Sequence, residues 1–391
     1  MRKKIFSMFL CASMVAMSLT GCGSSDKSSS GSSDTKSTSA TEAGSKSDAS
    51  DDELQVGIVL PTKDEPRWLQ DQKQFETILT EQGFNSQVLF SQGSSATEKA
   101  NVEALVADGM DVLIICAQDA TAAGAAVEEA KDAGVTVICY DRLITDTDAV
   151  DYYVTFDSVA VGKAQAQYLI DNKPEGTGIP LYLYAGAATD NNAFLFFEGA
   201  WEVLQPYVAD GTFVIANSDE AVDLSDKKTL SYEEKSSILG QVTTDWDFNV
   251  AKSRAEAHLT AADDDMKGDV CILAPNDGTA RAIADAFSAD SDIKSYVITG
   301  QDAEVASINY IMNGVQSMTV FKNTSVLAAD SCDMATSILN GSTPETDATY
   351  DNGNKEVPSK QTDITVVTAD NYKEILVDSG YYTQDEIDQA K

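Results

Sequence analysis

The spacing of apolar and polar residues alternates between two periods from residue 53 onward. Short apolar runs such as "LQVGIVL", "DVLIICA" and "VTVICYD" have the length and composition of buried strands. Between them lie amphipathic stretches such as "RWLQDQKQFETILTEQG" and "TAAGAAVEEAKDAG", each of which ends at a glycine, as helices commonly do. Strands that alternate with helices predict a parallel sheet with helices on both faces.

The alternation restarts once, which predicts two lobes. After the run "YYVTFD" and a helix expected over 158–171, five more strand-like runs follow: "PLYLYAG", "TFVIA", "DVCILAP", "SYVITG" and "SMTVFK". The chain has 391 residues, 43% of them hydrophobic, and a single core stops growing at about 250 to 300 residues. The expected fold class is therefore α/β, with two Rossmann-like, doubly wound parallel-sheet lobes.

Two segments depart from this alternation. Residues 217–247 are acidic and poor in apolar periodicity; we assign no helix or strand to them and expect a surface excursion. After Gly341 a polar segment precedes a strand, "DITVV", and a last helix that is expected to end near Gly380.

The first 52 residues have a different pattern, typical of an exported and tethered protein. A basic start, about fifteen apolar residues and small residues before Cys22 predict a signal peptide over 1–21, too short to span a bilayer. Residues 19–22, "LTGC", resemble the lipobox of bacterial lipoproteins, in which the chain is cut before a cysteine that is then lipidated; an ordinary signal peptide is the alternative. Residues 22–52 are rich in serine and lack aromatic residues, which predicts a disordered tether. The lipid would be the only membrane anchor.

The net charge of −36 excludes some classes of partner. A chain this acidic is repelled by nucleic acid and by anionic lipid surfaces. Removal of the signal peptide would make it more acidic still, because that segment holds three basic residues and no acidic one. A lone carboxylate therefore carries little information here, and an arginine or lysine at the end of a strand carries more.

Neither a metal nor a cofactor is predicted. Outside the first 22 residues the cysteines are expected to be buried free thiols, with a structural disulfide as the alternative, and they are Cys116, Cys139, Cys271 and Cys332. Their spacing does not fit zinc. The loop from Asp263 has a glycine at position 6 of a calcium-loop pattern but Ala274 at position 12, so we interpret it as a solvated loop.

An enzyme is not expected either, because the chain lacks the common catalytic motifs. No GxGxxG follows a strand, and no GxxxxGK[ST] loop is present. The only histidine, His258, lies in a helical run, where a surface or groove position is more common than a catalytic one. A pair of carboxylates in a cleft would leave glycoside hydrolysis as a remote alternative.

The side chains that follow the predicted strands favour a ligand with many hydroxyl groups. Ligands of open parallel sheets bind beyond the carboxyl ends of the strands. The residues found there are Lys63, Arg67, Trp68, Asp141, Arg142, Asp190, Asn191, Asn192, Asn276, Asp277, Gln301, Asp302 and Lys322. They form multiple hydrogen bonds, and tryptophan offers a flat face to a sugar ring. Taken singly, each has a plain alternative: Arg67 as a solvated residue, Trp68 as a core residue, and Asp190 or Asp302 as helix caps.

Several of these motifs together resemble one protein family. The stretches "PTKDEPRW", "CYDRLI", "YYVTFD", "DNNAFLFFEGA", "PNDGTA", "TGQDAE", "TVFK", "YDNGNKEVPS" and "DSGYYTQDEI" are similar to those of xylose-binding and multiple-sugar-binding proteins of ABC importers, in the type I periplasmic-binding-protein family. The resemblance spans residues 53–391. It implies a hinge of three crossovers near Asp157, Lys322 and Val357. The first lobe would comprise 53–157 and 323–356, and the second 158–322 and 357–391.

The resemblance also implies the site and the function. The ligand contacts it implies are Lys63, Arg67, Trp68, Asp141, Arg142, Asn191 or Asn192, Asn276, Asp302 and Lys322, with Trp246 as a stacking partner. The sequence departs from the family over 217–241, which affects the position of Trp246. The implied function is that of a monomeric, lipid-anchored protein at the cell surface or in the periplasm. It would capture xylose, glucose, galactose or a related aldose and deliver it to an ABC transporter permease. A sugar sensor that docks on a chemotaxis or histidine-kinase receptor is the alternative.

Overall fold

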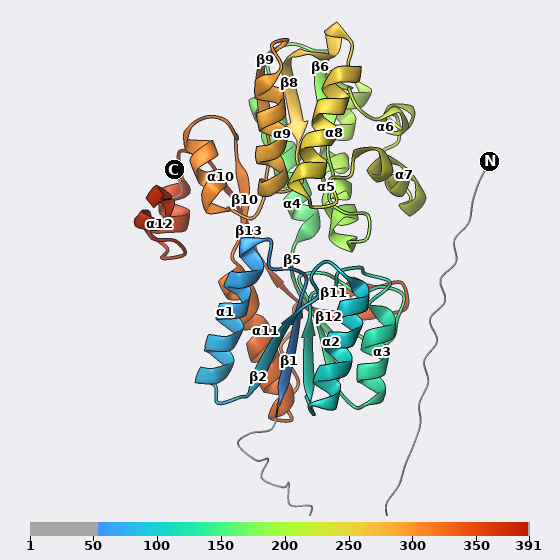
Figure 1. The fold of residues 1–391 in the computed structure, drawn as a ribbon. Helices are drawn as coiled ribbons and strands as arrows, with labels where there is room; N and C mark the ends of the chain where they lie inside the picture. The colour runs from blue at the N-terminus through green and yellow to red at the C-terminus, as the bar shows by residue number, and fades with distance from the viewer. Residues whose placement is uncertain (1–53, 390–391) are drawn as a thin grey trace, which may run out of the picture. The chain divides into compact units, whose positions relative to one another are not determined.

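Two mainly parallel sheets flanked by helices, together with a two-stranded antiparallel sheet, make up the described part of the chain (Figure 1). The computed structural model describes residues 54–389. The predicted signal peptide, the tether and Cys22 lie outside the described residues. Within 54–389, no helix combines the length and the apolar character that crossing a membrane would require.

The first lobe is built on a seven-stranded sheet. Its strand order is β11-β12-β5-β4-β3-β1-β2, and all neighbours are parallel except β11 and β12. The strands are β1 (Val56–Leu60), β2 (Ser86–Phe90), β3 (Val112–Ile115), β4 (Thr136–Tyr140), β5 (Tyr152–Phe156), β11 (Ala348–Asp351) and β12 (Glu356–Thr362). The helices are α1 (Pro66–Glu81), α2 (Ser95–Ala107), α3 (Gly124–Asp132) and α11 (Thr324–Leu339).

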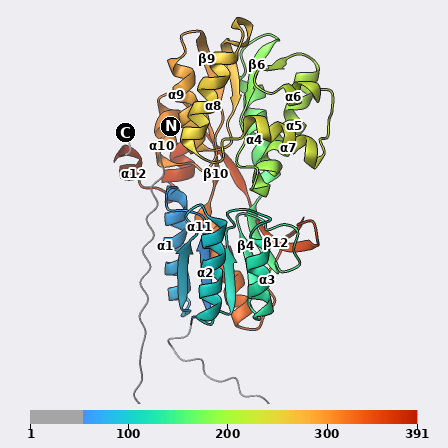
Figure 2. The same ribbon diagram turned by 45° about the vertical axis from the view of Figure 1, so that its right-hand side comes forward.

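Alternate residues of the strands in this lobe supply two separate cores. Ile58 and Ile114 pack with Phe75 of α1 and Leu327 of α11. Val59, one residue further along β1, belongs instead to the core beneath α2 and α3. Because successive side chains of a strand point to opposite faces, α1 and α11 cover one face and α2 and α3 the other (Figure 2). The continuous apolar runs in the sequence reflect this burial on both sides.

The second lobe has a smaller sheet with the same construction. Four parallel strands lie in the order β7-β6-β8-β9, and β10 pairs antiparallel with β13 beside them. The strands are β6 (Ile179–Leu183), β7 (Phe213–Ile215), β8 (Gly268–Leu273), β9 (Ile293–Ile298), β10 (Thr319–Lys322) and β13 (Ile364–Val367). The main helices are α4 (Ser158–Asn172), α5 (Asn191–Ala209), α8 (Phe248–Ala261), α9 (Asp277–Ala289) and α10 (Val305–Met312).

Helices α4 and α5 approach each other closely enough to require glycine. A Cβ atom added to Gly162 would lie 1.9 Å from the backbone oxygen of Phe196, and one added to Gly199 would lie 2.0 Å from that of Val159. Neither contact is possible for a larger residue without backbone movement. This contact holds the second and third turns of α5 against α4, and in the first turn Ser158 Oγ of α4 donates to Asn192 Oδ1 at 3.3 Å.

The chain passes between the lobes three times, and the third passage differs from the expectation. It leaves β5 for α4 after Phe156 and leaves β10 for α11 after Lys322. The third crossover was expected near Val357, but residues 356–362 form β12, which pairs with β5 from Ser359 to Thr362. The crossover therefore lies at Asp363, since β12 completes the first sheet before β13 joins β10.

The segment 217–247 is more ordered than its composition indicated. It contains α6 (Asp219–Asp223) and α7 (Tyr232–Val242). A capping box between Ser231 and Glu234 begins α7, and buried Ile238, Leu239 and Val242 join the core beside α5. The sequence did not indicate α7 because its buried apolar positions are confined to the last half of one short helix.

The C-terminal segment also differs in detail. In place of one helix ending near Gly380, a π-helical turn (Lys373–Val377) and a short helix, α12 (Gln384–Gln389), pack near α10. The four cysteines of the described chain are buried and unpaired, as their apolar surroundings indicated.

Candidate functional site

Side chains from both lobes converge on one small cavity, which we call the central cavity. It is lined by Glu65, Arg67, Trp68, Asp141, Arg142, Asp190, Asn192, Phe196, Trp246, Asn276, Gln301, Asp302 and Lys322. Most of these residues lie just beyond the carboxyl end of a strand, where the topology gathers the loops of each sheet. The cavity has a volume of about 30 Å³.

All but two of the expected ligand contacts line this cavity. Lys63 does not: it is exposed, and its Nζ lies 4.7 Å from the centre of the Phe90 ring. Asn191 lines a different cavity, whereas the adjacent Asn192 is buried and faces the central one.

Arg67 lies at the centre of the site and contacts three carboxylates. Its Nη1 donates to Asp141 Oδ1 at 3.2 Å, and its Nη2 lies 2.9 Å from Asp141 Oδ2. Its Nε is 3.6 Å from Asp71 Oδ2, and its Nη1 is 4.0 Å from Asp302 Oδ1 of the second lobe. The guanidinium stacks 4.4 Å from the Trp68 ring. A planar fork held in this way can present donors to a ligand at fixed angles.

Two more cations complete the charge network. Arg142 Nε lies 3.0 Å from Asp190 Oδ2, which also accepts a hydrogen bond from Trp246 Nε1 at 3.2 Å. Lys322 Nζ lies 2.9 Å from Asp302 Oδ1. These charges are almost fully buried, and buried charges are tolerated only when they are paired and hydrogen-bonded. The arrangement alternates positive and negative groups around the cavity, which suits a neutral ligand with both donors and acceptors.

The pKa values of the buried carboxyls separate according to their surroundings. Burial opposes the charge on Asp141, but Arg67, Lys322 and Arg142 outweigh it and lower the pKa of Asp141 to about 2. Asp71 lies deeper, and there burial outweighs the attraction of Arg67 and the hydrogen bond from Tyr140, raising the pKa of Asp71 to about 6. Asp141 is therefore a permanent anion facing the cavity.

Three residues of the site have a backbone conformation that non-glycine residues rarely adopt. The φ angles are +63° at Asp141, +58° at Trp246 and +98° at Asp302. The turned carbonyl of Asp141 accepts hydrogen bonds from Tyr153 Oη at 2.7 Å and Asn192 Nδ2 at 2.8 Å. Such strain costs about 1–3 kcal/mol per residue and is concentrated at functional sites.

Four residues of the cavity were not among the expected contacts. Asp190 and Gln301 had been noted only as residues at strand ends, and Glu65 and Phe196 lie within the motifs "PTKDEPRW" and "DNNAFLFFEGA" but were not singled out there. Gln301 is buried, and its Nε2 donates to the backbone oxygen of Pro275 at 2.7 Å. Its Oε1 accepts no hydrogen bond from any residue in 54–389. A buried acceptor without a partner is costly, so Gln301 is a candidate ligand contact.

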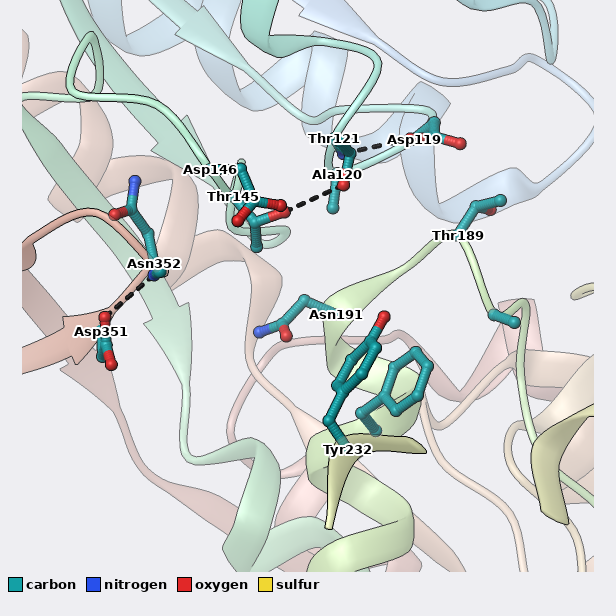
Figure 3. A pocket seen from close by; sticks show the side chains of 13 residues that line it. Asp119, Ala120, Thr121, Thr145, Asp146, Thr189, Asn191, Tyr232, Asp351 and Asn352 are labelled. Carbon is teal, nitrogen blue, oxygen red and sulfur yellow. Dashed lines mark hydrogen bonds between the residues drawn. The ribbon is translucent and has the colours of Figure 1, made fainter. Parts of the chain in front are cut away.

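Two other cavities are larger than the central one. One, of about 370 Å³, we call the adjoining cavity; it is lined by Asp64, Glu65, Pro66, Arg67, Gln70, Trp246, Phe248, Asn276, Gly278, Arg281, Asp302, Glu304, Val305, Ala306, Thr324, Tyr381 and Tyr382. The other, of about 470 Å³, shares no residue with the central cavity, and we call it the separate cavity. Figure 3 shows it, with Tyr232 and Asn191 on one side and Thr145 and Asp146 on another.

Comparison with known families identifies the fold. Residues 56–343 match the periplasmic binding protein domain family. The chain belongs to this family. Periplasmic binding proteins of this kind are solute-binding proteins rather than enzymes, and the two-lobed α/β fold described above is the type I form. The family resemblance inferred from the motifs is thereby confirmed.

Individual relatives are similar over most of the chain. The multiple sugar-binding periplasmic protein SbpA of Azospirillum brasilense is 36% identical over 341 residues, which is 85% of this chain and 91% of that protein. The D-xylose-binding periplasmic protein of Escherichia coli K12 is 31% identical over 86% of this chain and 93% of its own length. Among solved structures, a carbohydrate transporter solute-binding protein from Chloroflexus aurantiacus, in complex with D-glucose, is 62% identical with a TM-score of 0.83. The match covers 85% of this chain and 98% of that one.

Proposed function

We propose that this periplasmic binding protein captures an aldose in the central cavity and delivers it to an ABC sugar transporter. The observation that carries the proposal is the convergence of Arg67, Asp141 and Asp302 at the strand ends of both lobes. The relatives named for glucose, xylose or multiple sugars support the same ligand class.

The chemistry of the cavity suits sugar hydroxyls. Each hydroxyl group donates one hydrogen bond and accepts others. Carboxylates of Asp141 and Asp302 would accept, while Arg67 and Lys322 would donate. Trp246 and Phe196 line the same space, and their rings would cover the C–H face of the sugar. Hydrogen bonds to charged groups contribute about 1.5–3 kcal/mol each, so a few such contacts account for tight binding.

Binding would be coupled to movement of the lobes. A space of about 30 Å³ holds about two or three water molecules, since each needs about 10–15 Å³. A sugar can enter only if the groups around this space separate, and the three crossovers between the lobes provide a hinge. A ligand that contacts both lobes favours the closed form by its differential contacts.

The N-terminal segment supplies the second part of the proposal. Lipidation at Cys22 would anchor the protein to the membrane, and residues 23–52 would tether it as an exported monomer near the transporter. Replacing Cys22 by alanine should release the protein from washed membranes and leave sugar affinity unchanged. If the Cys22→Ala protein stayed in the membrane fraction, the anchor would have to lie elsewhere.

A ligand screen tests the proposal as a whole. Thermal unfolding of the mature protein should be measured with glucose, xylose, galactose and ribose, and with glycerol as a control of similar chemistry. A ligand that binds only the folded form raises the midpoint by mass action, with about 2.7 kcal/mol of stabilisation at 100 times the Kd. We expect at least one aldose to raise the midpoint by several degrees and glycerol to leave it unchanged. An unchanged midpoint with every aldose would contradict the proposal.

A further inference from the structure

The adjoining cavity shares a wall with the central cavity. Glu65, Arg67, Trp246, Asn276 and Asp302 line both of them. The separate cavity shares no residue with either. One layer of side chains therefore divides the adjoining cavity from the central one.

The contact between Arg67 and Asp302 in this wall is long. The two side chains come from different lobes, and their closest charged atoms are 4.0 Å apart. Each side chain has a closer partner of opposite charge. Arg67 lies 2.9 Å from Asp141, and Asp302 lies 2.9 Å from Lys322. Arg67 and Asp302 can therefore move apart while both keep a neutralising partner, and this movement would join the two cavities.

The adjoining cavity has the size and the lining of a carbohydrate site. Its volume of about 370 Å³ falls in the range of about 300–1,000 Å³ that is usual for small-molecule sites. Aromatic residues contribute Trp246, Phe248 and the Tyr381–Tyr382 pair, whose rings lie 4.7 Å apart at 73°. Phe248 leaves 60% of its surface exposed at the start of α8, so its ring is accessible to a ligand in this cavity.

Polar groups stand beside these rings in fixed positions. Arg281 Nη2 pairs with Glu304 Oε2 at 2.6 Å, and Arg281 Nη1 donates to Ser307 Oγ at 2.6 Å. Thr324 Oγ1 and Tyr381 Oη are within hydrogen-bond distance at 3.0 Å. Flat apolar faces bordered by carboxylate, guanidinium and hydroxyl groups match a pyranose ring, which has C–H faces and a hydroxyl edge.

From these observations we propose that the binding site extends through the wall at Arg67 and Asp302 into the adjoining cavity. The protein then accepts an aldose that carries a second sugar unit: the first ring lies in the central cavity and the second ring lies against Phe248 and Trp246. The inference rests on the proposed function and adds to it the length of the ligand.

Calorimetric titration of the mature protein with D-glucose, cellobiose, maltose and gentiobiose tests the extension. The three disaccharides differ in the linkage between two glucose units. We expect at least one of them to bind with a Kd within about tenfold of that of glucose. Glucose binding together with disaccharides that are all more than about tenfold weaker would overturn the extension and leave the proposed function intact. A protein that binds none of the four sugars would overturn the extension, and the proposed function would fall with it only if xylose, galactose and ribose also leave the unfolding midpoint unchanged.

A matched pair of variants assigns the second ring to its cavity. Phe248 and Tyr232 are both 60% exposed, but Tyr232 lines the separate cavity. Phe248→Ala should weaken the best disaccharide about fivefold and change the Kd of glucose less than about twofold. Tyr232→Ala should change neither. Equal effects of Phe248→Ala on glucose and disaccharide, or an effect of Tyr232→Ala as large as that of Phe248→Ala, would contradict the assignment.

Discussion

The two lobes hold their halves of the site by different means. In the first lobe, Arg67 is fixed by side chains of its own lobe: Asp141 at 2.9 Å, Asp71 at 3.6 Å and the Trp68 ring at 4.4 Å. In the second lobe, both contacts of Asp302 lead to β10: its backbone N–H donates to the Val320 backbone oxygen at 2.9 Å, and its carboxylate lies 2.9 Å from Lys322 Nζ at the end of the same strand. β10 is also the strand that leads into a crossover between the lobes.

This difference separates a preformed half of the site from a half coupled to the hinge. Arg67 keeps its orientation whether or not the lobes meet. Its partners Asp141, Asp71 and Trp68 belong to the same lobe and do not move relative to it. The position of Asp302 changes with any movement of β10. The first lobe would therefore bind the sugar initially, and the second would report its presence by closing.

The largest loss of sugar affinity is expected from removing the carboxylate of Asp141, which fixes Arg67. Asp141→Ala leaves a buried guanidinium without its main partner, and breaking a buried pair in this way costs about 3–5 kcal/mol. We expect sugar affinity to fall at least a hundredfold, which corresponds to about 2.7 kcal/mol. Asp146→Ala is the matched control, because Asp146 has nearly the same backbone φ, +60° against +63°, but is exposed. A similar loss in both variants would mean that backbone strain, rather than the carboxylate, is responsible.

A smaller loss of sugar affinity is expected from replacing Asp302, in the half of the site that is coupled to the hinge. Asp302→Ala and Asp302→Gly both remove the carboxylate and should weaken sugar binding about tenfold. The φ of +98° at this position favours glycine, so the glycine variant should be more stable than the alanine variant by about 1 kcal/mol. Chemical denaturation and calorimetry on the two variants measure both quantities. Equal stability of the two would show that the backbone here is not strained.

Asp71 and Tyr140 form a buried pair behind Arg67, and this pair predicts that the stability of the protein depends on pH. The pKa of Asp71 is raised from 3.8 to about 6 in the folded protein, chiefly by burial, so the native state binds this proton more tightly than the unfolded state. The contribution is fully present below pH 3.8 and is lost as the pH rises through about 6; two pKa units set its upper size at about 3 kcal/mol. Asp71→Asn should therefore flatten the rise in unfolding free energy on going from pH 7 to pH 4, as measured by urea titrations. A slope as steep as that of the unchanged protein would contradict this account.

The smallest measurable change is expected in the size of the molecule when the lobes close around the sugar. Saturating aldose should reduce the radius of gyration measured by small-angle scattering by about 1 Å, since hinge closure moves lobes as nearly rigid bodies. The Asp302→Ala protein, at a sugar concentration that saturates it, should contract less. An unchanged radius in the parent protein would exclude closure of the lobes around the sugar.

Helices and strands could be predicted from the sequence where both faces of an element are buried. They could not be predicted where only a few neighbouring residues pack against the core. The uninterrupted run over Val112–Ile115 is buried on both faces, so its periodicity identifies a central strand. By contrast, α7 buries only Ile238, Leu239 and Val242, and so short an apolar cluster does not stand out from an acidic segment. The passage at Asp363 was misplaced because β12 is polar and pairs at its C-terminal half with β5 alone.

The residues of the site divide in the same way, into those that the sheet topology places and those that only the tertiary fold brings together. Residues directly after strands, such as Asp141 and Asp302, could be predicted because topology alone brings strand ends together. The groups behind them could not: Tyr140 donates to Asp71 across 69 positions of sequence, at 2.8 Å. Nothing in the chain marks such a pair before the fold brings it together. Lys63 was expected in the cavity because of its place in the motif, but the turn before α1 directs it toward Phe90.

Calorimetry on Arg67→Ala tests the central claim most directly, because Arg67 contacts carboxylates of both lobes around the central cavity. Arg254→Ala is the matched control; Arg254 lies on α8, donates to the backbone oxygen of Gln241 at 2.6 Å and lines none of the three cavities described above. Titrated with the aldose that gives the largest thermal shift, Arg67→Ala should bind at least about tenfold more weakly than the parent protein, and Arg254→Ala should bind within about threefold of it. An Arg67→Ala protein that binds this aldose with unchanged affinity would contradict the account, because the sugar would then have to bind somewhere other than the central cavity.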